Sequence, residues 1–238
     1  MSPSGPGQRS LARSAASRTA LIRPSRDGSL RAVYEPSLAR PRSRLTAAER
    51  RKKIVAAAAE VFIEQGYSGA RTKEIAERAG VTEAFLYRHL ASKEEMYEAA
   101  ILEPLRDGLA ALAYDIQIYY DKLVDPIAFM DAVNERCLRF YTDMAAIQAV
   151  ALYSELGKGR ELYQNSLKPI LDGIGELIAK RMGWAERGLE VDLVRRAILG
   201  AQWGIGLDLM LRHRKVDLNE AARRLTVLFT GGVREKSA

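Results

Sequence analysis

The side chains with the clearest chemical potential lie between residues 71 and 93, where charged and polar types recur at helical spacing. Arg88 could bind the two acceptor atoms of a guanine edge, and Glu83 could accept a hydrogen bond from a cytosine amino group. Plainer roles stay open: Glu83 could only be a partner of its helix dipole, and Arg88 could contact phosphate alone. Tyr87 and His89 could pack within the motif. The chemistry that this segment predicts is recognition of DNA.

Patterns for catalysis or metal binding do not occur in the sequence. The two histidines, His89 and His213, have no cysteine or carboxylate at metal-ligand spacing. A nucleophile elbow, a phosphate loop and a dinucleotide-binding glycine pattern are all missing. Cys137, the single cysteine, lies in an apolar helical stretch and is expected to be a buried small side chain. We therefore expect no enzyme, no metal and no cofactor.

Two short helices must position the side chains of residues 71–93. The first covers residues 72–79, and its small Ala76 lets a second helix cross closely. Gly80 suits the turn because it adopts a positive φ without a Cβ penalty. Thr82 is expected to cap the second helix, whose Leu86 packs inward. The result is a helix-turn-helix that presents its outward residues to a major groove. These outward residues are Glu83, Ala84, Tyr87, Arg88 and His89.

Helical spacing continues along the chain from residue 46 onward, so the predicted fold class is all-α with about nine helices. Capping boxes at Thr46 with Glu49 and at Ser92 with Glu95 indicate two helix starts. Pro104, inside one predicted helix, is expected to kink it. The predicted domains are a three-helix DNA-binding head over 46–93 and an effector-binding and dimerisation body over 94–238. The predicted helices cover about 46–66, 72–79, 82–90, 93–122, 125–145, 146–156, 160–182, 189–213 and 217–230.

This part of the chain resembles the TetR family of transcriptional regulators. The resemblance covers about 50 residues, through the strings AAAAEVFIEQGYSGART and KEIAERAGVTEAFLYRHLASKEEMY. Two positions depart from the family pattern: Phe85 stands where a small or hydroxylated residue is usual, and Leu90 replaces the common Phe. The resemblance implies contacts with phosphate from Arg71, Thr72 and Lys93, with bases from Thr82, Glu83, Ala84 and Arg88, and with either from Tyr87 and His89.

The end of the chain predicts a dimer interface. Residues 197–211 are apolar nearly all round and include three glycines, which suggests close approach of another backbone. Together with the helix over 217–230, they suit a two-fold four-helix interface, which is also where the resembling family dimerises. The alternative is packing within one chain. A dimer would read a palindromic operator. The expected interface residues are Gly200, Trp203, Gly204, Leu207, Leu225, Leu228 and Phe229.

Large side chains between the two ends of the chain could line a small-molecule cavity, although each of them could also belong to the core. The expected effector is hydrophobic or aromatic. A ligand in the body would tilt the head and change the spacing of the recognition helices, with the kink at Pro104 as the hinge. The candidate lining residues are Tyr119, Tyr120, Phe129, Met130, Cys137, Phe140, Tyr141, Met144, Tyr153 and Tyr163.

The first 45 residues carry the excess charge of the chain. They hold nine Arg against Asp27 and Glu35, which equals the net charge of +7 for all 238 residues. Rich in Pro and Ser, this tail is predicted to be disordered. It could be an extension without function, a basic arm on DNA, or a transit peptide. We find neither an apolar run of membrane-spanning length nor a secretory signal, so a cytoplasmic protein is expected.

Together these features predict a dimeric, sequence-specific DNA-binding transcriptional regulator. It is expected to be a repressor that a small hydrophobic or aromatic effector releases from its operator. The alternative is a helical architectural or interaction protein that binds DNA without a ligand. Footprinting would distinguish the two, because a regulator protects a short symmetric site and an architectural protein covers DNA without regard to sequence.

Overall fold

The computed structural model describes residues 21–24, 30–33, 46–212 and 216–231, and the chain divides into a unit of residues 1–44 and a unit of residues 45–238. In the first unit, β1 (Leu21–Pro24) pairs antiparallel with β2 (Leu30–Val33). The sequence analysis expected no strand in this tail. The sequence does contain a local pattern that favours a hairpin. An Asp-Gly pair, which is common in hairpin turns, stands between the apolar stretches 21–24 and 30–33. The other residues of the tail, for which disorder was predicted, lie outside the described residues.

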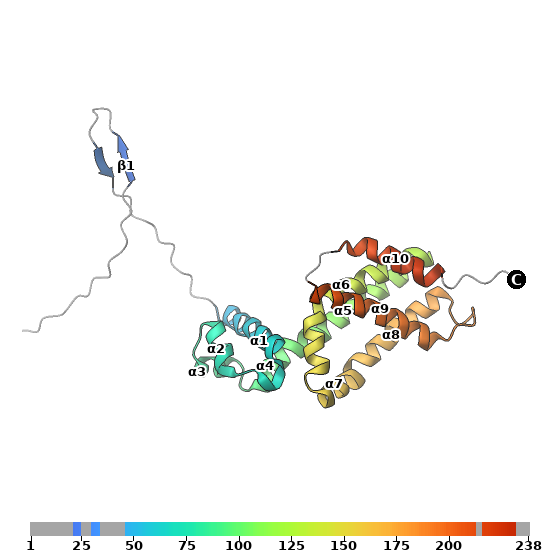
Figure 1. The fold of residues 1–238 in the computed structure, drawn as a ribbon, viewed down its shortest axis with the longest axis horizontal. Coiled ribbons are helices and arrows are strands. Elements are labelled where there is room, and N and C mark those ends of the chain that lie inside the picture. Colours follow the sequence, from blue (N-terminus) through green and yellow to red (C-terminus); the bar gives the residue numbers. More distant parts are fainter. Residues whose placement is uncertain (1–20, 25–29, 34–45, 213–215, 232–238) are drawn as a thin grey trace, which may run out of the picture. The chain divides into compact units, whose positions relative to one another are not determined.

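The second unit confirms the predicted all-α class, because every element described in residues 46–212 and 216–231 is a helix (Figure 1). Two short π-helical turns, η1 and η2, interrupt longer helices without ending them. The elements are α1 (Ala47–Gly69), α2 (Thr72–Ala79), α3 (Glu83–His89), α4 (Lys93–Tyr97), η1 (Glu98–Leu102), α5 (Glu103–Lys122), α6 (Pro126–Tyr153), α7 (Leu156–Leu162), η2 (Tyr163–Leu167), α8 (Lys168–Met182), α9 (Val191–Leu211) and α10 (Leu218–Gly231).

The predicted capping residues lie at the ends of their helices. The backbone N–H of Glu49 donates to the Thr46 hydroxyl at 3.2 Å, and the Glu49 carboxylate accepts from the Thr46 N–H at 2.7 Å. Gly66, with φ of 69°, interrupts the helical backbone of α1, and Gly183, with φ of 61°, ends α8. Local sequence therefore determines where these helices begin and end.

One prediction about helix continuity needs correction, and the kink predicted at Pro104 stays a prediction. The break expected near residue 145 is wrong, because α6 runs unbroken to Tyr153; strong helix formers, Ala145 and Ala146, stand there instead of Gly or Pro. At Pro104 the helix continues into α5, and the preceding turn, η1, is π-helical. A widened turn accommodates the N–H that proline lacks. Pro169 follows η2 in the same way.

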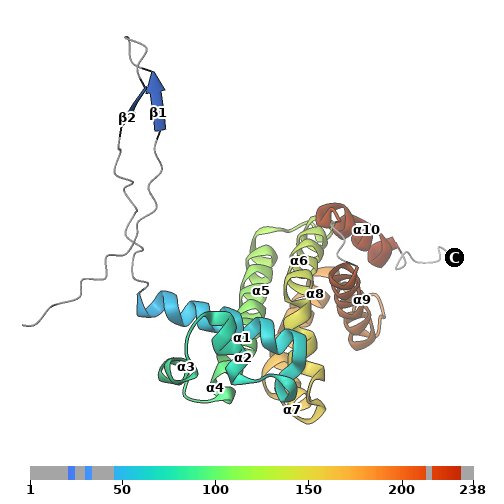
Figure 2. The ribbon, with the colours of Figure 1, turned by 60° about the vertical axis from the view of Figure 1, so that its left-hand side comes forward.

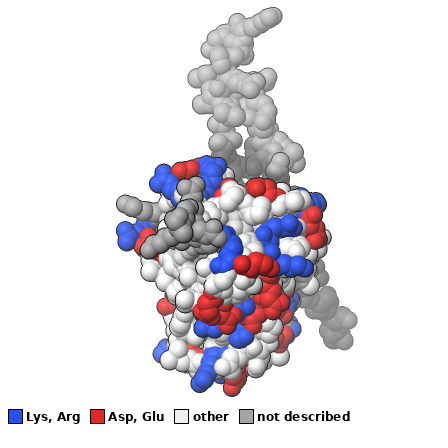
Figure 3. All heavy atoms as spheres, turned by 90° about the vertical axis from the view of Figure 1, so that its right-hand side faces the viewer, with Lys and Arg blue, Asp and Glu red and all other residues white. Residues whose placement is uncertain are grey.

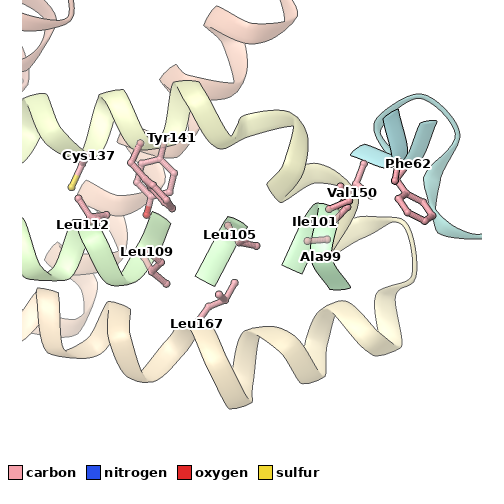
Figure 4. Packing of buried hydrophobic residues seen from close by; sticks show 14 of the residues in the cluster. Phe62, Ala99, Ile101, Leu105, Leu109, Leu112, Cys137, Tyr141, Val150 and Leu167 are labelled. Atoms are coloured by element: carbon pink, nitrogen blue, oxygen red, sulfur yellow. The ribbon is translucent and has the colours of Figure 1, made fainter. Parts of the chain in front are cut away.

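α6 is the central helix of the body. It packs against α5, α9 and α10, while α1 to α4 form the smaller head at the other end of this unit (Figures 1 and 2). One apolar cluster runs through both parts, from Phe62 of α1 through Ile101 to Cys137 of α6, and Figure 4 labels these three side chains along it. Burial of this shared cluster holds the head against the body.

None of the helices in the described ranges combines the length and the apolar character needed to cross a membrane.

Three buried polar side chains link α6, α9 and α10. The Gln202 amide donates to Asn134 Oδ1 at 2.6 Å, and the Asn134 amide donates to Thr226 Oγ1 at 3.0 Å. Thr226 in turn donates to the Ala222 carbonyl oxygen at 3.1 Å. Because an unpaired buried polar group costs free energy, these bonds favour one register of α9 and α10 on α6.

We predict that Asn134→Ala lowers the free energy of unfolding by about 2 kcal/mol, because it leaves Gln202 and Thr226 without their partner. Urea unfolding followed by circular dichroism measures the change. Gln117→Ala is the control: this residue also hydrogen-bonds, to Asp121 at 2.9 Å, but at the surface. Its change should stay within about 0.5 kcal/mol. Equal losses of unfolding free energy in both variants would show that the buried hydrogen bonds contribute no more stability than the surface one.

Candidate nucleic-acid interface and body cavity

The turn between α2 and α3 has the geometry that the sequence predicted. Gly80 adopts a left-handed conformation with φ of 67° and ψ of 37°, and the N–H of Val81 donates to the Ala76 carbonyl oxygen at 3.0 Å. Ile75 and Leu86 are fully buried on either side of this turn. The two helices therefore form a helix-turn-helix with a closed apolar inner face.

The outer face of α3 is open to solvent. Thr82 caps the helix by accepting a hydrogen bond from the Phe85 N–H at 3.2 Å. Glu83, Ala84 and Arg88 are exposed, and Tyr87 is 43% exposed. Within the described residues Arg88 has no hydrogen-bond or ion-pair partner. The predicted base-reading side chains thus share one accessible face of a capped helix.

Hydrogen bonds between side chains order part of this face. The Thr72 hydroxyl donates to Glu83 Oε1 at 2.6 Å, and the Tyr87 hydroxyl donates to Thr72 Oγ1 at 3.2 Å. Both bonds join α2 to α3. Glu83 therefore has Thr72 as its hydrogen-bond partner. Its negative charge also interacts favourably with the helix dipole, because Glu83 lies in the first turn of α3.

Phe85, which departs from the family pattern, contacts two neighbouring side chains through its ring. The His89 ring packs against it with centroids 4.8 Å apart, and the Arg50 guanidinium lies 5.8 Å from its ring centroid. His89 is consequently half-buried, whereas Arg88 beside it is exposed. An aromatic side chain at this position orients a cation and an imidazole instead of contacting DNA through a hydroxyl.

Two basic residues of α1 join the interface although the sequence analysis did not select them. Arg50 and Lys53 line a hollow of about 360 Å³ together with Gly80, Thr82 and Phe85, at the start of α3. The signal that could have found them is the run Arg-Arg-Lys-Lys at positions 50–53. Helical spacing places only some of these four side chains beside α3, and that selection depends on how α1 crosses α2.

Arg78 joins α2 to α1. Its guanidinium pairs with Glu64 and, at 2.8 Å, with Glu74, and hydrogen bonding to Glu64 is the main cause of its raised pKa. Gln65 of α1 also donates to Glu74 at 2.7 Å. These contacts join α2 to α1 and involve no residue of α3, so they position the motif without occupying Arg88.

Lys93 stands in the first turn of α4, where the sequence predicted a phosphate contact. Ser92 caps this helix by accepting from the Glu95 N–H at 3.0 Å. The Lys93 ammonium lies 4.8 Å from the centroid of the Tyr67 ring, which follows Gly66 at the end of α1. Burial is the main cause that raises the pKa of Tyr67 to about 12, followed by its hydrogen bond to Glu94. Tyr67 therefore stays a neutral donor at ordinary pH.

The body contains a cavity of about 260 Å³ between α5, α6, α8 and α9. Leucine and aromatic side chains form most of its wall. Gln148 is 4% exposed and, within the described residues, its amide has no protein partner. Arg196 stands at the rim with its side chain 72% exposed. The lining residues are Leu105, Leu109, Phe140, Tyr141, Gln148, Leu152, Tyr153, Tyr163, Leu167, Leu171, Arg196, Leu199, Gly200 and Trp203.

The structure brings Phe140, Tyr141, Tyr153 and Tyr163 to this cavity, out of the ten side chains that the sequence selected. The other six lie elsewhere, because residue type alone does not show which side of a helix faces the gap. Phe129, Met130 and Cys137 are fully buried in the core, and burial raises the pKa of the Cys137 thiol to about 12. Tyr120 packs on Phe129 and Arg181, and Tyr119 and Met144 are half-buried outside the lining.

The three glycines of α9 face different surroundings. At Gly206 an added Cβ would lie 2.7 Å from the Tyr141 carbonyl carbon, so this glycine permits close packing on α6. Gly200 and Gly204 are exposed, and an added Cβ there would have nothing within 4 Å. The close backbone approach that the sequence predicted occurs within the chain at Gly206 and leaves the other two positions free.

The remaining interface candidates divide in a similar way. Leu225 of α10 is 7% exposed and packs on Leu138 of the same chain, whereas Leu228 is 64% exposed. Trp203, Leu207 and Phe229 are half-buried. On the face shown in Figure 3, acidic and basic side chains are interspersed beside a broad uncharged area, so this face has no field of one sign.

Sequence comparison identifies relatives of the head in particular. The family described as "Bacterial regulatory proteins, tetR family" matches residues 54–100. The HTH-type transcriptional activator FasR of Mycolicibacterium smegmatis is 47% identical over 69 residues, which are 29% of this chain and only 31% of FasR. The HTH-type transcriptional repressor KstR2 of the same species is 30% identical over 166 residues, which are 66% of this chain and 77% of KstR2.

Comparison with solved structures extends the likeness to the body. The transcriptional regulator FadR from Bacillus subtilis, solved in complex with stearoyl-CoA, superposes with a TM-score of 0.58 and covers 76% of this chain and 98% of its own. Sequence identity in this superposition is 19%, so the similarity is one of fold.

We predict that Tyr67→Phe makes the stability of the protein less sensitive to alkali. In the wild type the Tyr67 contribution is complete below the unfolded pKa of about 10 and is lost as the pH rises toward 12, because only the unfolded phenol ionises in that range. Urea unfolding at several pH values between these limits tests this. A loss of stability with pH as steep in the variant as in the wild type would contradict it.

Proposed function

The chain belongs to the TetR family of bacterial transcriptional regulators, and we propose that it is a dimeric repressor that a small amphipathic effector releases from a palindromic operator. The observation that carries the DNA-binding part is the open, hydrogen-bonded outer face of α3 above a closed apolar inner face. Because the target is DNA, we place its action in the bacterial cytoplasm.

Base recognition is assigned to the outer face of α3. Arg88 is exposed, unpaired within the described residues, and able to bind a guanine edge with two hydrogen bonds. Glu83 is already oriented by Thr72 and can accept from a cytosine amino group. Thr82, Ala84, Tyr87 and His89 complete the surface that faces the groove.

Phosphate contacts are assigned to basic residues around this face. Arg71 is exposed just before α2, and Lys93 stands at the N-terminus of α4, where the helix dipole also favours an anion. Arg50 and Lys53 add charge beside the start of α3. Such contacts fix the position of the head on DNA and carry no sequence information by themselves.

Dimerisation is assigned to α9 and α10. Gly200 and Gly204 form an open, side-chain-free stretch on α9, and Val227 and Leu228 of α10 are 69% and 64% exposed. Exposed apolar side chains on α10 and open glycines on α9 both favour close approach of a second copy. The neighbouring half-buried Trp203, Leu207 and Phe229 would complete this interface, while Leu225 supports it from within the chain.

The effector site is assigned to the body cavity. Its wall of leucine and aromatic side chains suits an apolar chain, the unpartnered amide of Gln148 can bind one polar group inside, and Arg196 at the rim can bind an anion. Burial raises the pKa of Tyr141, so its hydroxyl stays a neutral hydrogen-bonding group. The stearoyl-CoA complex of FadR supports an acyl thioester as the first compound to test.

Repression is favoured over activation by the relatives. KstR2, of which 77% is matched, is a repressor, whereas the match to the activator FasR spans 31% of that protein.

The DNA-binding proposal predicts that the protein selects an inverted repeat from random duplexes, with half-site centres about 34–36 Å apart. Arg88→Ala should relax the preference at one base pair of each half-site, where it costs about 1–3 kcal/mol of discrimination. Sequencing of bound fragments measures both effects. Arg50→Ala is the control, because loss of a phosphate contact should weaken all sequences alike.

Two outcomes would contradict this assignment. If Arg88→Ala weakened every sequence by one factor, Arg88 would be a phosphate contact only. If footprints of the wild type covered DNA without regard to sequence, the chain would be the architectural protein that is the alternative to a regulator.

The effector proposal predicts that medium- or long-chain acyl-coenzyme A releases the wild type from its selected DNA. Leu171→Trp should fill part of the body cavity, so that the variant binds DNA normally but no longer responds. Leu177→Trp is the matched control, because Leu177 is also a half-buried leucine of α8 and does not line the cavity. Fluorescence anisotropy of labelled DNA reports both properties. Equal responses of the two variants would place the ligand elsewhere.

A further inference from the structure

Tyr67 lies where α1 and α4 of the head come close to α7 of the body. Its hydroxyl donates to Glu94 Oε1 at 2.6 Å. Its ring stacks on Phe62 with centroids 6.1 Å apart and an angle of 11° between the planes, and meets Tyr97 edge-on with centroids 5.0 Å apart. These three contacts, all with residues of the head, keep the Tyr67 ring in one orientation.

Two ammonium groups from different parts of the chain lie against this ring. Lys93, from the head, is 4.8 Å from its centroid, and Lys158, from α7 of the body, is 4.5 Å away. Each distance is short enough for a cation–π attraction. Two like charges around one ring also repel each other, so the arrangement depends on nearby carboxylates.

Glu155 is the carboxylate that pairs with Lys158, one of these two cations. It stands at the N-cap position of α7, where Oε2 lies 2.9 Å from the Lys158 ammonium and Oε1 accepts from the Ser68 hydroxyl at 3.1 Å. Hydrogen bonding from Lys158 is the main cause that lowers the pKa of Glu155, with smaller contributions from Ser68 and from the charge of Lys93. If Lys158 were absent, the Glu155 carboxylate would lose this ion pair and would still attract the positive charge of Lys93.

We propose that Lys158 is a positioning residue for DNA binding: by pairing with Glu155 and sharing the Tyr67 ring, it leaves the Lys93 ammonium free for a DNA phosphate. This rests on the proposed function, in which Lys93 contacts phosphate. Without Lys158, the Glu155 carboxylate competes with DNA for Lys93.

The position of Lys158 depends on the wall of the body cavity. Leu152 and Tyr153 line that cavity, and the chain turns directly after them into α7. Gly159 is pressed against the Leu152 carbonyl group, where an added Cβ would overlap. Tyr67 and Lys158 also line a second hollow, of about 250 Å³, and the Lys158 side chain is 67% exposed, so packing does not hold the lysine in place. A ligand that moves the end of α6 therefore moves Lys158 as well.

The salt dependence of DNA binding tests this role, because each phosphate contact contributes about 0.9 to the slope of log K against log salt concentration. With the selected operator and the full chain, Lys158→Ala should lower the slope by about 0.9 and weaken binding roughly fivefold. Lys93→Ala should lower the slope equally, and the double variant of Lys93 and Lys158 should show no further decrease. Adding Glu155→Gln to Lys158→Ala should restore the slope.

Lys180→Ala is the control. Its ammonium lies 5.9 Å from the Tyr120 ring centroid, a contact of the same kind within the body, and its loss should leave the slope unchanged. The proposal is overturned if Lys158→Ala keeps the wild-type slope, or if Glu155→Gln fails to restore it, since a merely structural role would weaken binding at every salt concentration alike. A wild type that selects no DNA sequence would instead overturn the proposed function.

Discussion

Burial of Leu86 and Leu90 beneath α3 is the constraint on which the DNA-binding surface depends. A helix of seven residues does not persist alone, since nucleation costs more than so few hydrogen bonds return. Its inner face must therefore be fixed by α1 and α2, and the outer face follows from that choice. Gly80 sets the crossing of the two helices, and Thr82 begins the second one in register with it.

Charge in the head is divided between holding the motif and meeting a partner. Arg78 pairs with Glu64 and Glu74 and joins α2 to α1, while Arg88 keeps no partner in the described part of the chain. Individual surface contacts of this kind contribute little stability. Their value lies in orientation, because Thr72 holds both Glu83 and Tyr87 in place before any ligand arrives. An ordered surface loses less conformational entropy on binding.

The body uses single helices for several purposes at once. α9 packs Gly206 against α6, lines the cavity with Trp203, and leaves Gly204 open on its third side. α6 packs against α5, α9 and α10, and its end reaches both the cavity and α7, the helix that carries Lys158. Because the core of head and body is continuous, movement in one part has a packed route to the other (Figure 4).

Local features could be predicted from the order of the residues alone: the all-α class, the caps at Thr46 and Thr82, the turn at Gly80, and the outward residues of α3. Each of these depends on residues within a few positions of one another. Packing between distant segments determines which aromatic side chains reach the cavity, that Gln148 and Arg196 join them, and that Lys158 shares the Tyr67 ring with Lys93. Helical spacing shows which residues share a face, but which neighbour that face meets depends on crossing angles set by packing across the whole core.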